Sequence, residues 1–378
     1  MVLSRFSVLM NGEICVIKLR VICCFVLLLV LCSCSAGNVA EESVWISQGY
    51  LKDECVAQIG EKLYTYLPGE NENIREYLYE IDKTGNKTVV ICDKEGCAHE
   101  QQGHLVDPCN AFDYATLGLM ADGEFLYSGS HNGSVGISRH SIKNGSKETV
   151  LQTELPISCF YVEDGSVYYA QQDQNYGEPV LRKEDNGYRL FVRSTDQKTQ
   201  EPKLLYERKG VIGYIACIQK FDEVMFLTEV FYPSGNVQDA TMNVVMLNGE
   251  SGEIVHVVEN AGGHNIAKIG LNYAIPSDSI GMVLVDEKGM VCKQIDCGKK
   301  AMCIGVEGYL LVDSVVDGER ELSVYNDSGE RMGKCFVTEA YSDMLGADQN
   351  YVYYWKETGE KALLEGIDWR VCIEKSAA

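Results

Sequence analysis

A strand–turn–strand unit recurs along most of the chain and constrains its fold more than any other feature. Each copy has an alternating apolar segment, a polar turn rich in Gly, Asn, Asp, Ser or Thr, and a second short segment. Gly, Asn and Asp favour such turns because they tolerate the positive φ that tight hairpins need. The copies occupy residues 78–90, 138–151, 190–205, 244–258, 282–295, 322–336 and 354–364. We therefore expect an all-β domain built from consecutive hairpins.

The spacing of the turns predicts how these hairpins are grouped. Turn centres run from near residue 85 to near residue 359 in six steps, which gives an average repeat of about 46 residues. A four-stranded propeller blade has roughly 40–50 residues, and packing blades around an axis buries sheet faces that one blade leaves exposed. Tyr-rich segments that we interpret as inner blade strands precede most hairpins, at 61–64, 123–127, 165–169, 308–311 and 351–354.

We predict a β-propeller of six to seven, at most eight, four-stranded blades over residues 44–378. The last repeat is short, and residues 43–50 could supply the strand that closes the ring. A pair of β-sandwiches and an irregular β-solenoid are the alternatives, because turn spacing alone does not separate them from a propeller.

The first 33 residues have the pattern of an export signal. Lys18 and Arg20 precede an uncharged apolar run over residues 21–31. This run is shorter than the roughly 20 residues that a membrane-spanning helix needs, and it matches the apolar part of a secretory signal. We therefore expect residues 1–33 to be a signal peptide.

The end of this run, Leu31-Cys32-Ser33-Cys34, resembles the lipobox of bacterial lipoproteins. Cleavage before Cys34 places the small residue Ser33 before the cut, whereas cleavage before Cys32 would place Leu31 there. The resemblance implies a diacylglyceryl group on Cys34, with residues 34–43 as lipidated cysteine and tether, and an extracytoplasmic location at the cell membrane. An ordinary cleaved signal is the alternative.

The charge of the mature chain limits its partners. After residues 1–33 are removed, 30 basic and 54 acidic side chains remain, a net charge of −24. Nucleic acid binding needs clustered Lys and Arg, so this balance excludes that class of partner. We expect membrane contact through the N-terminal lipid only.

A Cys/His cluster is the sharpest local motif. Cys92, Cys97, His99 and Cys109 lie within eighteen positions, directly after the first hairpin. Thiolate and imidazole are ligands that suit Zn²⁺, and four protein ligands would make a closed, structural site. His104 is a substitute for His99. A disulfide and reduced, unpaired thiols are the alternatives, since export permits oxidation.

The segment Cys-x4-Cys-x-His, followed by Cys109-Asn110-Ala111 and preceded by a Leu-Tyr-x-Ile-Asp strand, resembles a group of uncharacterised lipoproteins from anaerobic Gram-positive bacteria. That group is similar to six- to eight-bladed propellers that carry a domain of unknown function. The resemblance extends over the whole chain. It implies a propeller fold and a surface location, and it implies no activity.

The remaining cysteines suggest other uses. Eleven cysteines are left once Cys34 is lipidated, so they cannot all pair within one chain. Three of them lie in apolar strand patterns and are interpreted as small buried hydrophobic residues; these are Cys159, Cys217 and Cys335. The second cluster has no His and suits a disulfide or free thiols; it contains Cys292, Cys297 and Cys303.

No catalytic motif stands out. The sequence contains no nucleophile elbow, phosphate-binding loop or His-Glu-x-x-His. His140 and His256 lie in strand patterns and are expected to be structural. Asp82, Asp286 and Asp327 are expected to stabilise turns. We expect a non-catalytic binding, sensing or interaction module for a glycan, peptide or protein; a glycan lyase or hydrolase on the same scaffold is the alternative.

Overall fold

The fold is a ring of antiparallel sheets in a computed structural model of the chain. The chain divides into two units, residues 1–50 and 51–378, and all described residues belong to the second. The structure describes residues 56–60, 62–68, 75–81, 87–97, 109–114, 116–130, 136–173, 186–196, 201–263, 265–277, 281–338, 341–347, 349–357 and 362–376. The predicted boundaries near residues 33 and 43, Cys34 and the proposed closing strand at 43–50 lie outside them.

The strands form seven sheets, here called blades 1 to 7, in chain order. Blade 1 contains β1 (Val56–Ile59), β2 (Lys62–Pro68), β3 (Arg75–Ile81), β4 (Lys87–Val90) and β5 (Phe112–Tyr114). Blade 2 contains β6 (Thr116–Asp122), β7 (Phe125–Ser130), β8 (Gly136–Ser141) and β9 (Lys147–Gln152). Blade 3 contains β10 (Ile157–Glu163), β11 (Ser166–Gln172), β12 (Gly187–Ser194) and β13 (Lys203–Lys209).

Blade 4 contains β14 (Gly213–Phe221), β15 (Val224–Phe231), β16 (Thr241–Asn248) and β17 (Ile254–Glu259), with a short 3-10 helix, η2 (Val237–Asp239), between β15 and β16. Blade 5 contains β18 (Ala267–Ile269), β19 (Asn272–Ser277), β20 (Gly281–Val285) and β21 (Val291–Ile295). Blade 6 contains β22 (Lys299–Val306), β23 (Tyr309–Val316), β24 (Glu319–Tyr325) and β25 (Arg331–Phe336). Blade 7 contains β26 (Tyr341–Ala347), β27 (Tyr351–Glu357) and β28 (Ala362–Asp368), and helix α2 (Arg370–Ser376) follows it.

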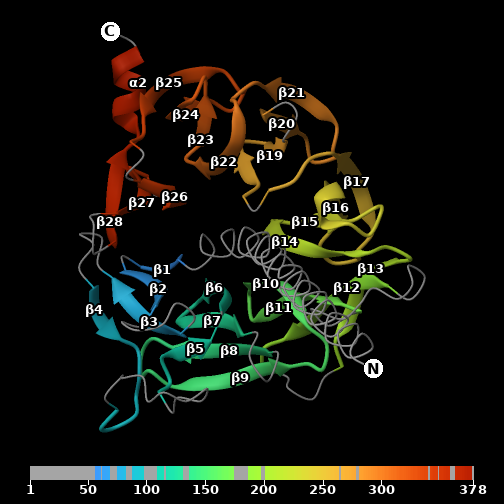
Figure 1. Cartoon of the computed structure of the whole chain (residues 1–378), viewed down its shortest axis with the longest axis vertical. Coiled ribbons are helices and arrows are strands. Elements are labelled where there is room, and N and C mark those ends of the chain that lie inside the picture. Colours follow the sequence, from blue (N-terminus) through green and yellow to red (C-terminus); the bar gives the residue numbers. More distant parts are fainter. Residues whose placement is uncertain are drawn as a thin grey trace, which may run out of the picture. The chain divides into compact units, whose positions relative to one another are not determined.

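The blades follow one another around a ring, as the colours in Figure 1 show. The first strand of a blade contacts the first strand of the next at β1–β6, β6–β10, β10–β14, β18–β22 and β22–β26. At these five junctions one blade covers a face of its neighbour. The predicted β-propeller is confirmed, with seven blades, and the sandwich and solenoid alternatives are wrong.

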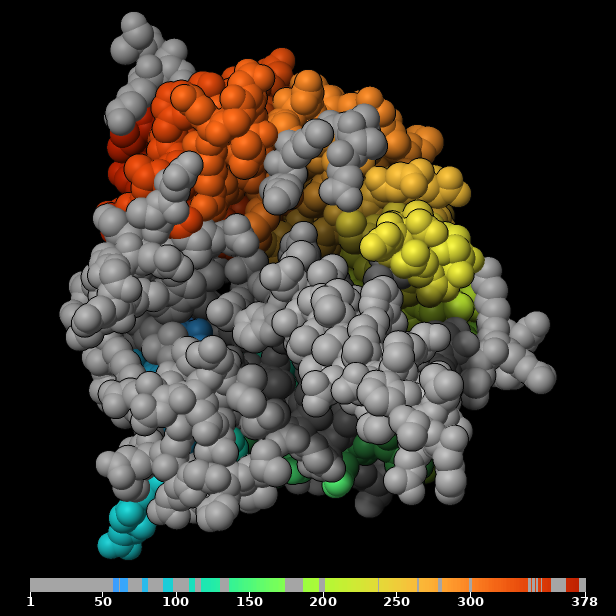
Figure 2. Space-filling view, in the orientation of Figure 1, coloured from blue at the N-terminus to red at the C-terminus, as the bar shows by residue number. Residues whose placement is uncertain are grey.

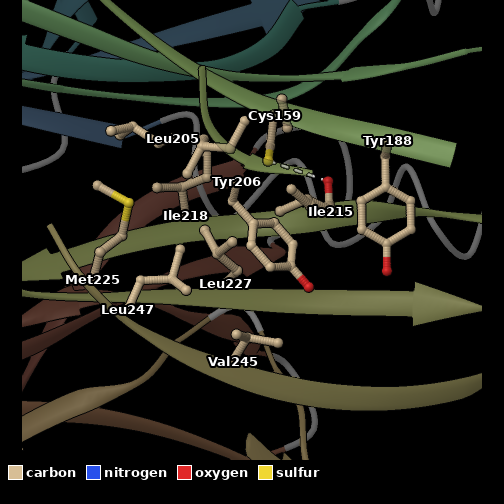
Figure 3. Packing of buried hydrophobic residues seen from close by; sticks show 12 residues of the cluster. Cys159, Tyr188, Leu205, Tyr206, Ile215, Ile218, Met225, Leu227, Val245 and Leu247 are labelled. Atoms are coloured by element: carbon tan, nitrogen blue, oxygen red, sulfur yellow. Dashed lines mark hydrogen bonds between the residues drawn. The ribbon is translucent and has the colours of Figure 1, made fainter. Parts of the chain in front are cut away.

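The sequence repeat corresponds to specific strand pairs. Six of the predicted hairpins are the third and fourth strands of blades 1 to 6, and the hairpin at 354–364 is instead β27–β28 of blade 7. Buried side chains of neighbouring blades meet between the sheets. Figure 3 shows this for blades 3 and 4, where Tyr206 from β13, Ile215 from β14 and Leu227 from β15 belong to one core cluster.

The turns of the outer hairpins also connect blades. Asp286 stabilises the β20–β21 turn, as predicted, by accepting the backbone N–H of Lys288 at 2.9 Å and of Met290 at 2.8 Å. Gly289 in this turn has φ +78°, and an added Cβ would lie 2.2 Å from the Cβ of His256 on β17 of blade 4. The predicted structural role of His256 therefore has a physical basis: the turn of one blade packs on the outer strand of the preceding blade.

One turn prediction was wrong by a single residue. Asn326, and not Asp327, accepts the backbone N–H groups of Ser328 at 3.2 Å and Glu330 at 2.8 Å. Its neutral amide oxygen fulfils the function expected of a carboxylate. Asp82 lies outside the described residues.

Candidate metal centre

Three cysteine side chains come together at the outer edge of blade 1. The Sγ atoms of Cys92, Cys97 and Cys109 all lie within 4.8 Å of one another. Cys109 is buried, and Cys92 and Cys97 are half-buried. The spacing in the sequence therefore identified a cluster of three possible ligands. His99 and His104, the predicted imidazole ligands, lie outside the described residues.

The cluster forms because the outer strand of blade 1 is interrupted. β4 pairs with one part of β3 and β5 with another, so the segment from Ile91 to Ala111 is an excursion from a single strand edge. Leu78 of β3 joins the two ends: its N–H donates to the Ala111 carbonyl at 2.9 Å, and its carbonyl accepts the Ile91 N–H at 3.1 Å. Cys92 directly follows Ile91, and Cys109 lies two residues before Ala111. The ladder itself therefore places both cysteines at the two ends of the excursion, which we call its neck.

A tight turn returns Cys97 to the same place. The Cys97 N–H donates to the Lys94 carbonyl at 3.2 Å, and Gly96 has φ +72°. Gly adopts this left-handed conformation without the steric penalty of a Cβ. The four-residue gap between the first two cysteines therefore serves to reverse the chain. The described part of this excursion is the cyan segment at the lower left of Figure 1.

Backbone N–H groups point at two of the sulfur atoms. Burial alone would raise the pKa of Cys92, but hydrogen bonds from the backbone of Lys94 and Asn110 and from the other two thiols lower it below its ordinary value. Burial raises the pKa of Cys109, although the backbone N–H of Ala111 opposes this effect. Amide donors aimed at sulfur stabilise a thiolate, which is the form that binds metal ions.

Blade 2 packs directly on the neck of the excursion. Gly145, in the β8–β9 turn, has φ +71°, and an added Cβ would lie 2.8 Å from both the Cys92 carbonyl carbon and the Asp93 nitrogen. The Lys147 Nζ donates to the Phe112 carbonyl at 2.8 Å, and the Asn110 side chain donates to Asp93. The three thiols therefore lie at the junction of two blades.

The other cysteines follow the predictions in part. Cys159 and Cys217 are buried within their strands, and the Cys159 thiol donates to the Ile215 carbonyl at 3.2 Å (Figure 3). Cys297 and Cys303 are buried free thiols, and Cys292 is an exposed one.

The prediction for Cys335 was wrong. It forms a disulfide with Cys372 of α2, with 5.0 Å between the two Cα atoms. Local apolar alternation around Cys335 gave no indication of a partner 37 residues away in a helix that follows the last strand.

Buried carboxylates are engaged in scaffold contacts that the sequence analysis did not single out. Glu229 accepts the Tyr206 hydroxyl at 2.7 Å and pairs with Arg208. Asp313 pairs with Arg320 through two hydrogen bonds, at 2.8 and 2.6 Å. An acidic residue in the middle of an apolar strand, as in β15 and β23, was the signal that could have identified both.

Two further buried residues, Glu321 and His140, also have polar partners within the scaffold. Burial alone would raise the pKa of Glu321, but hydrogen bonds from Lys334 and Ser323 lower it. His140 is buried, as predicted for a structural residue, and its Nε2 lies 3.1 Å from the Tyr66 hydroxyl and 3.3 Å from the Ser128 hydroxyl.

No helix within the described segments has the length and apolar character needed to cross a membrane. No protein-family model matches the chain, and no curated protein matches it.

Solved structures do resemble the fold. A prolyl endopeptidase superposes with a TM-score of 0.58 at 13% identity, over 86% of this chain and 48% of that one. An acylaminoacyl peptidase from Pyrococcus horikoshii gives 0.52 at 12% identity, over 83% and 50% of the two chains. A chain of the mitotic checkpoint complex gives 0.51 at 10% identity, over 85% and 90%. The chain thus spans about half the length of the two peptidase chains, and at these identities the likeness shows a shared propeller fold.

Proposed function

We propose that this chain is a lipid-anchored, extracytoplasmic propeller that acts as a non-catalytic interaction module. Its partner would bind the face of the ring that carries the longer connections. The observation that carries this proposal is an ordered, exposed connection on that face, at residues 232–240 of blade 4.

The two faces of the ring differ in their connections. Because neighbouring strands are antiparallel, turns from first to second strands lie on one face and connections from second to third strands lie on the other. The former are tight, as at 123–124, 164–165, 222–223 and 307–308, where several residues have positive φ. Among the described examples of the latter, 317–318 is a tight turn, whereas 232–240 is much longer. Function concentrates in such connections on a rigid scaffold.

Hydrogen bonds within the connection at 232–240, and from it to the segment before β14, hold its conformation in the structure. The Tyr232 N–H donates to the Ile212 carbonyl at 2.8 Å. Asn236 caps η2 by accepting the Gln238 N–H at 3.1 Å. Residues 233–236 are exposed, and Figure 2 shows the yellow atoms of this region uncovered on the viewed face. An ordered surface loses little conformational entropy on binding, which favours affinity for a partner.

The sulfur chemistry supports an extracytoplasmic location. Disulfides persist in oxidising compartments, and β25 and α2 are joined by one. This agrees with the lipobox at Cys34 and with the net charge of −24 of the mature chain. Four of the exposed side chains of the 232–240 connection are polar, namely Ser234, Asn236, Gln238 and Asp239, which suits a polar glycan, peptide or protein surface.

The buried acids support binding rather than catalysis. Glu229, Asp313 and Glu321 are each bonded to Arg, Lys or Tyr of the scaffold. Carboxylates held in this way fix the strands, and they are not poised as a general acid and base for glycan cleavage.

Photo-crosslinking in intact cells tests the proposed binding face. A photoreactive amino acid would replace Gln238 on the long-connection face or, as the matched control, Glu287 in the β20–β21 turn on the opposite face; both positions are exposed. We expect a discrete adduct that is several-fold more abundant from position 238. Equal adducts from the two positions, or none from position 238, would contradict the proposed face.

Detergent phase partitioning of the full-length protein tests the anchor. We expect the wild type in the detergent phase and Cys34→Ala in the aqueous phase, because two or three acyl chains give stable membrane attachment that a soluble propeller lacks. Cys292→Ser, which changes an exposed thiol on β21, should partition as the wild type does. Retention of Cys34→Ala in the detergent phase would refute lipidation at this residue.

A further inference from the structure

We propose that Cys92, Cys97 and Cys109 bind one Zn²⁺ through three thiolates, and that this ion fastens the neck of the blade 1 excursion beneath the outer hairpin of blade 2. The argument depends on the convergence of three sulfur ligands, on the N–H groups that surround them, and on their position in the fold.

The convergence of three sulfurs favours a metal over a disulfide. Zn–S bonds of about 2.3 Å in a tetrahedral site place sulfur atoms about 3.8 Å apart. Mutual distances within 4.8 Å require only a small contraction to reach that arrangement. A disulfide would join two of the sulfurs at about 2.0 Å and leave the third beside them without a function.

The backbone supplies donors that a ligating thiolate needs. Cys92 receives the N–H of Lys94, and Cys109 receives the N–H of Ala111, so each sulfur is bonded by the amide two residues further along. Cys92 also receives the N–H of Asn110. Such outer-shell donors orient metal ligands and balance part of their negative charge. Three thiolates gathered in a partly buried site would require a cation, because an uncompensated charge away from water is strongly unfavourable.

The place of the three cysteines in the fold gives a bound metal ion a structural role. The excursion leaves the sheet between Ile91 and Ala111, where the outer ladder of blade 1 is interrupted. The ion would join the two ends of the gap and the turn at Cys97. Because Gly145 of blade 2 contacts Cys92 and Asp93, the same ion would stabilise the junction of blades 1 and 2.

The test is the metal content of the full-length chain, purified under reducing conditions, incubated with Zn²⁺ and freed of excess metal. We expect one zinc ion per chain by inductively coupled plasma mass spectrometry. Cys97→Ser should reduce that content at least several-fold, and Cys109→Ser should do the same. Cys292→Ser, an exposed cysteine on β21 outside the cluster, should retain one ion. Circular dichroism identifies variants that fail to fold.

A second measurement does not depend on any variant. Co²⁺ in place of Zn²⁺ should give intense sulfur-to-metal charge-transfer absorption of a strength that corresponds to three thiolates. Zinc content near zero in the reconstituted wild type, unchanged zinc in both folded cluster variants, or a cobalt spectrum without thiolate bands would each overturn the proposal. A disulfide between two of the three cysteines in protein isolated without reductant, found by peptide mass spectrometry, would overturn it as well.

Discussion

Asp313→Ala is expected to lower the free energy of unfolding by about 3–5 kcal/mol, the range for removing one partner of a buried ion pair. The Asp313 side chain is 4% exposed and that of Arg320 is 18% exposed, so little water would replace the lost carboxylate. Arg320 also donates to the Tyr341 carbonyl at 2.7 Å and lies 5.5 Å from the ring centre of Tyr354. The pair therefore connects blade 6 to blade 7, and its loss should loosen that junction.

Urea unfolding, followed by both tryptophan fluorescence and far-ultraviolet circular dichroism, would measure this change, and coincident transitions would justify a two-state analysis. Glu319 is exposed and begins β24, directly before Arg320. The control substitution Glu319→Ala should therefore change the free energy of unfolding by less than about 0.5 kcal/mol. The double variant Asp313→Leu/Arg320→Met should recover part of the loss, because it removes both charges together. If Asp313→Ala is no more destabilising than Glu319→Ala, the pair does not stabilise the ring.

The fold was predictable from sequence because its repeating element is local. A hairpin such as β20–β21 can be recognised in the sequence from Asp286 and Gly289, which fix the turn within a few residues. The interval between such turns then indicates the blade. Local pattern did not show which strand pair of a blade a hairpin represents, so the segment at 354–364 was not recognised as the second and third strands of blade 7.

The thiol cluster was predictable for a similar reason. Cys92 and Cys109 are far apart in sequence for a turn, but they flank a gap in one strand edge, and the pairing of β4 and β5 with β3 brings them together. The disulfide of Cys335 was missed because it depends on a contact between β25 of blade 6 and helix α2, which follows blade 7. That contact leaves no spacing signal, since any cysteine further along the chain could have been the partner, whereas the pair of Asp313 and Arg320 lies within the β23–β24 hairpin and was overlooked there.

That disulfide leads to the second large prediction. Cys335→Ser/Cys372→Ser is expected to lower the free energy of unfolding by about 2–4 kcal/mol, mainly because the unfolded chain gains freedom when the cross-link is removed. In the folded state the bond fastens α2 against β25, where the Cys372 carbonyl lies so near Gly333 that an added Cβ would be 2.3 Å away. It also secures Trp369, which is buried, with its ring centre 5.4 Å from that of Tyr309.

The measurement compares urea unfolding of the wild type and the double variant with and without a phosphine reductant. Reductant should bring the wild type to the stability of the variant and leave the variant unchanged, which separates the cross-link from the effect of the serine side chains. Cys292→Ser, which alters an exposed free thiol, should behave as the wild type in both conditions. An unchanged unfolding midpoint in wild type whose bond is verified as reduced would mean that the packing of Trp369 and α2 on blade 6 suffices, and that the covalent link adds nothing to the stability of the ring.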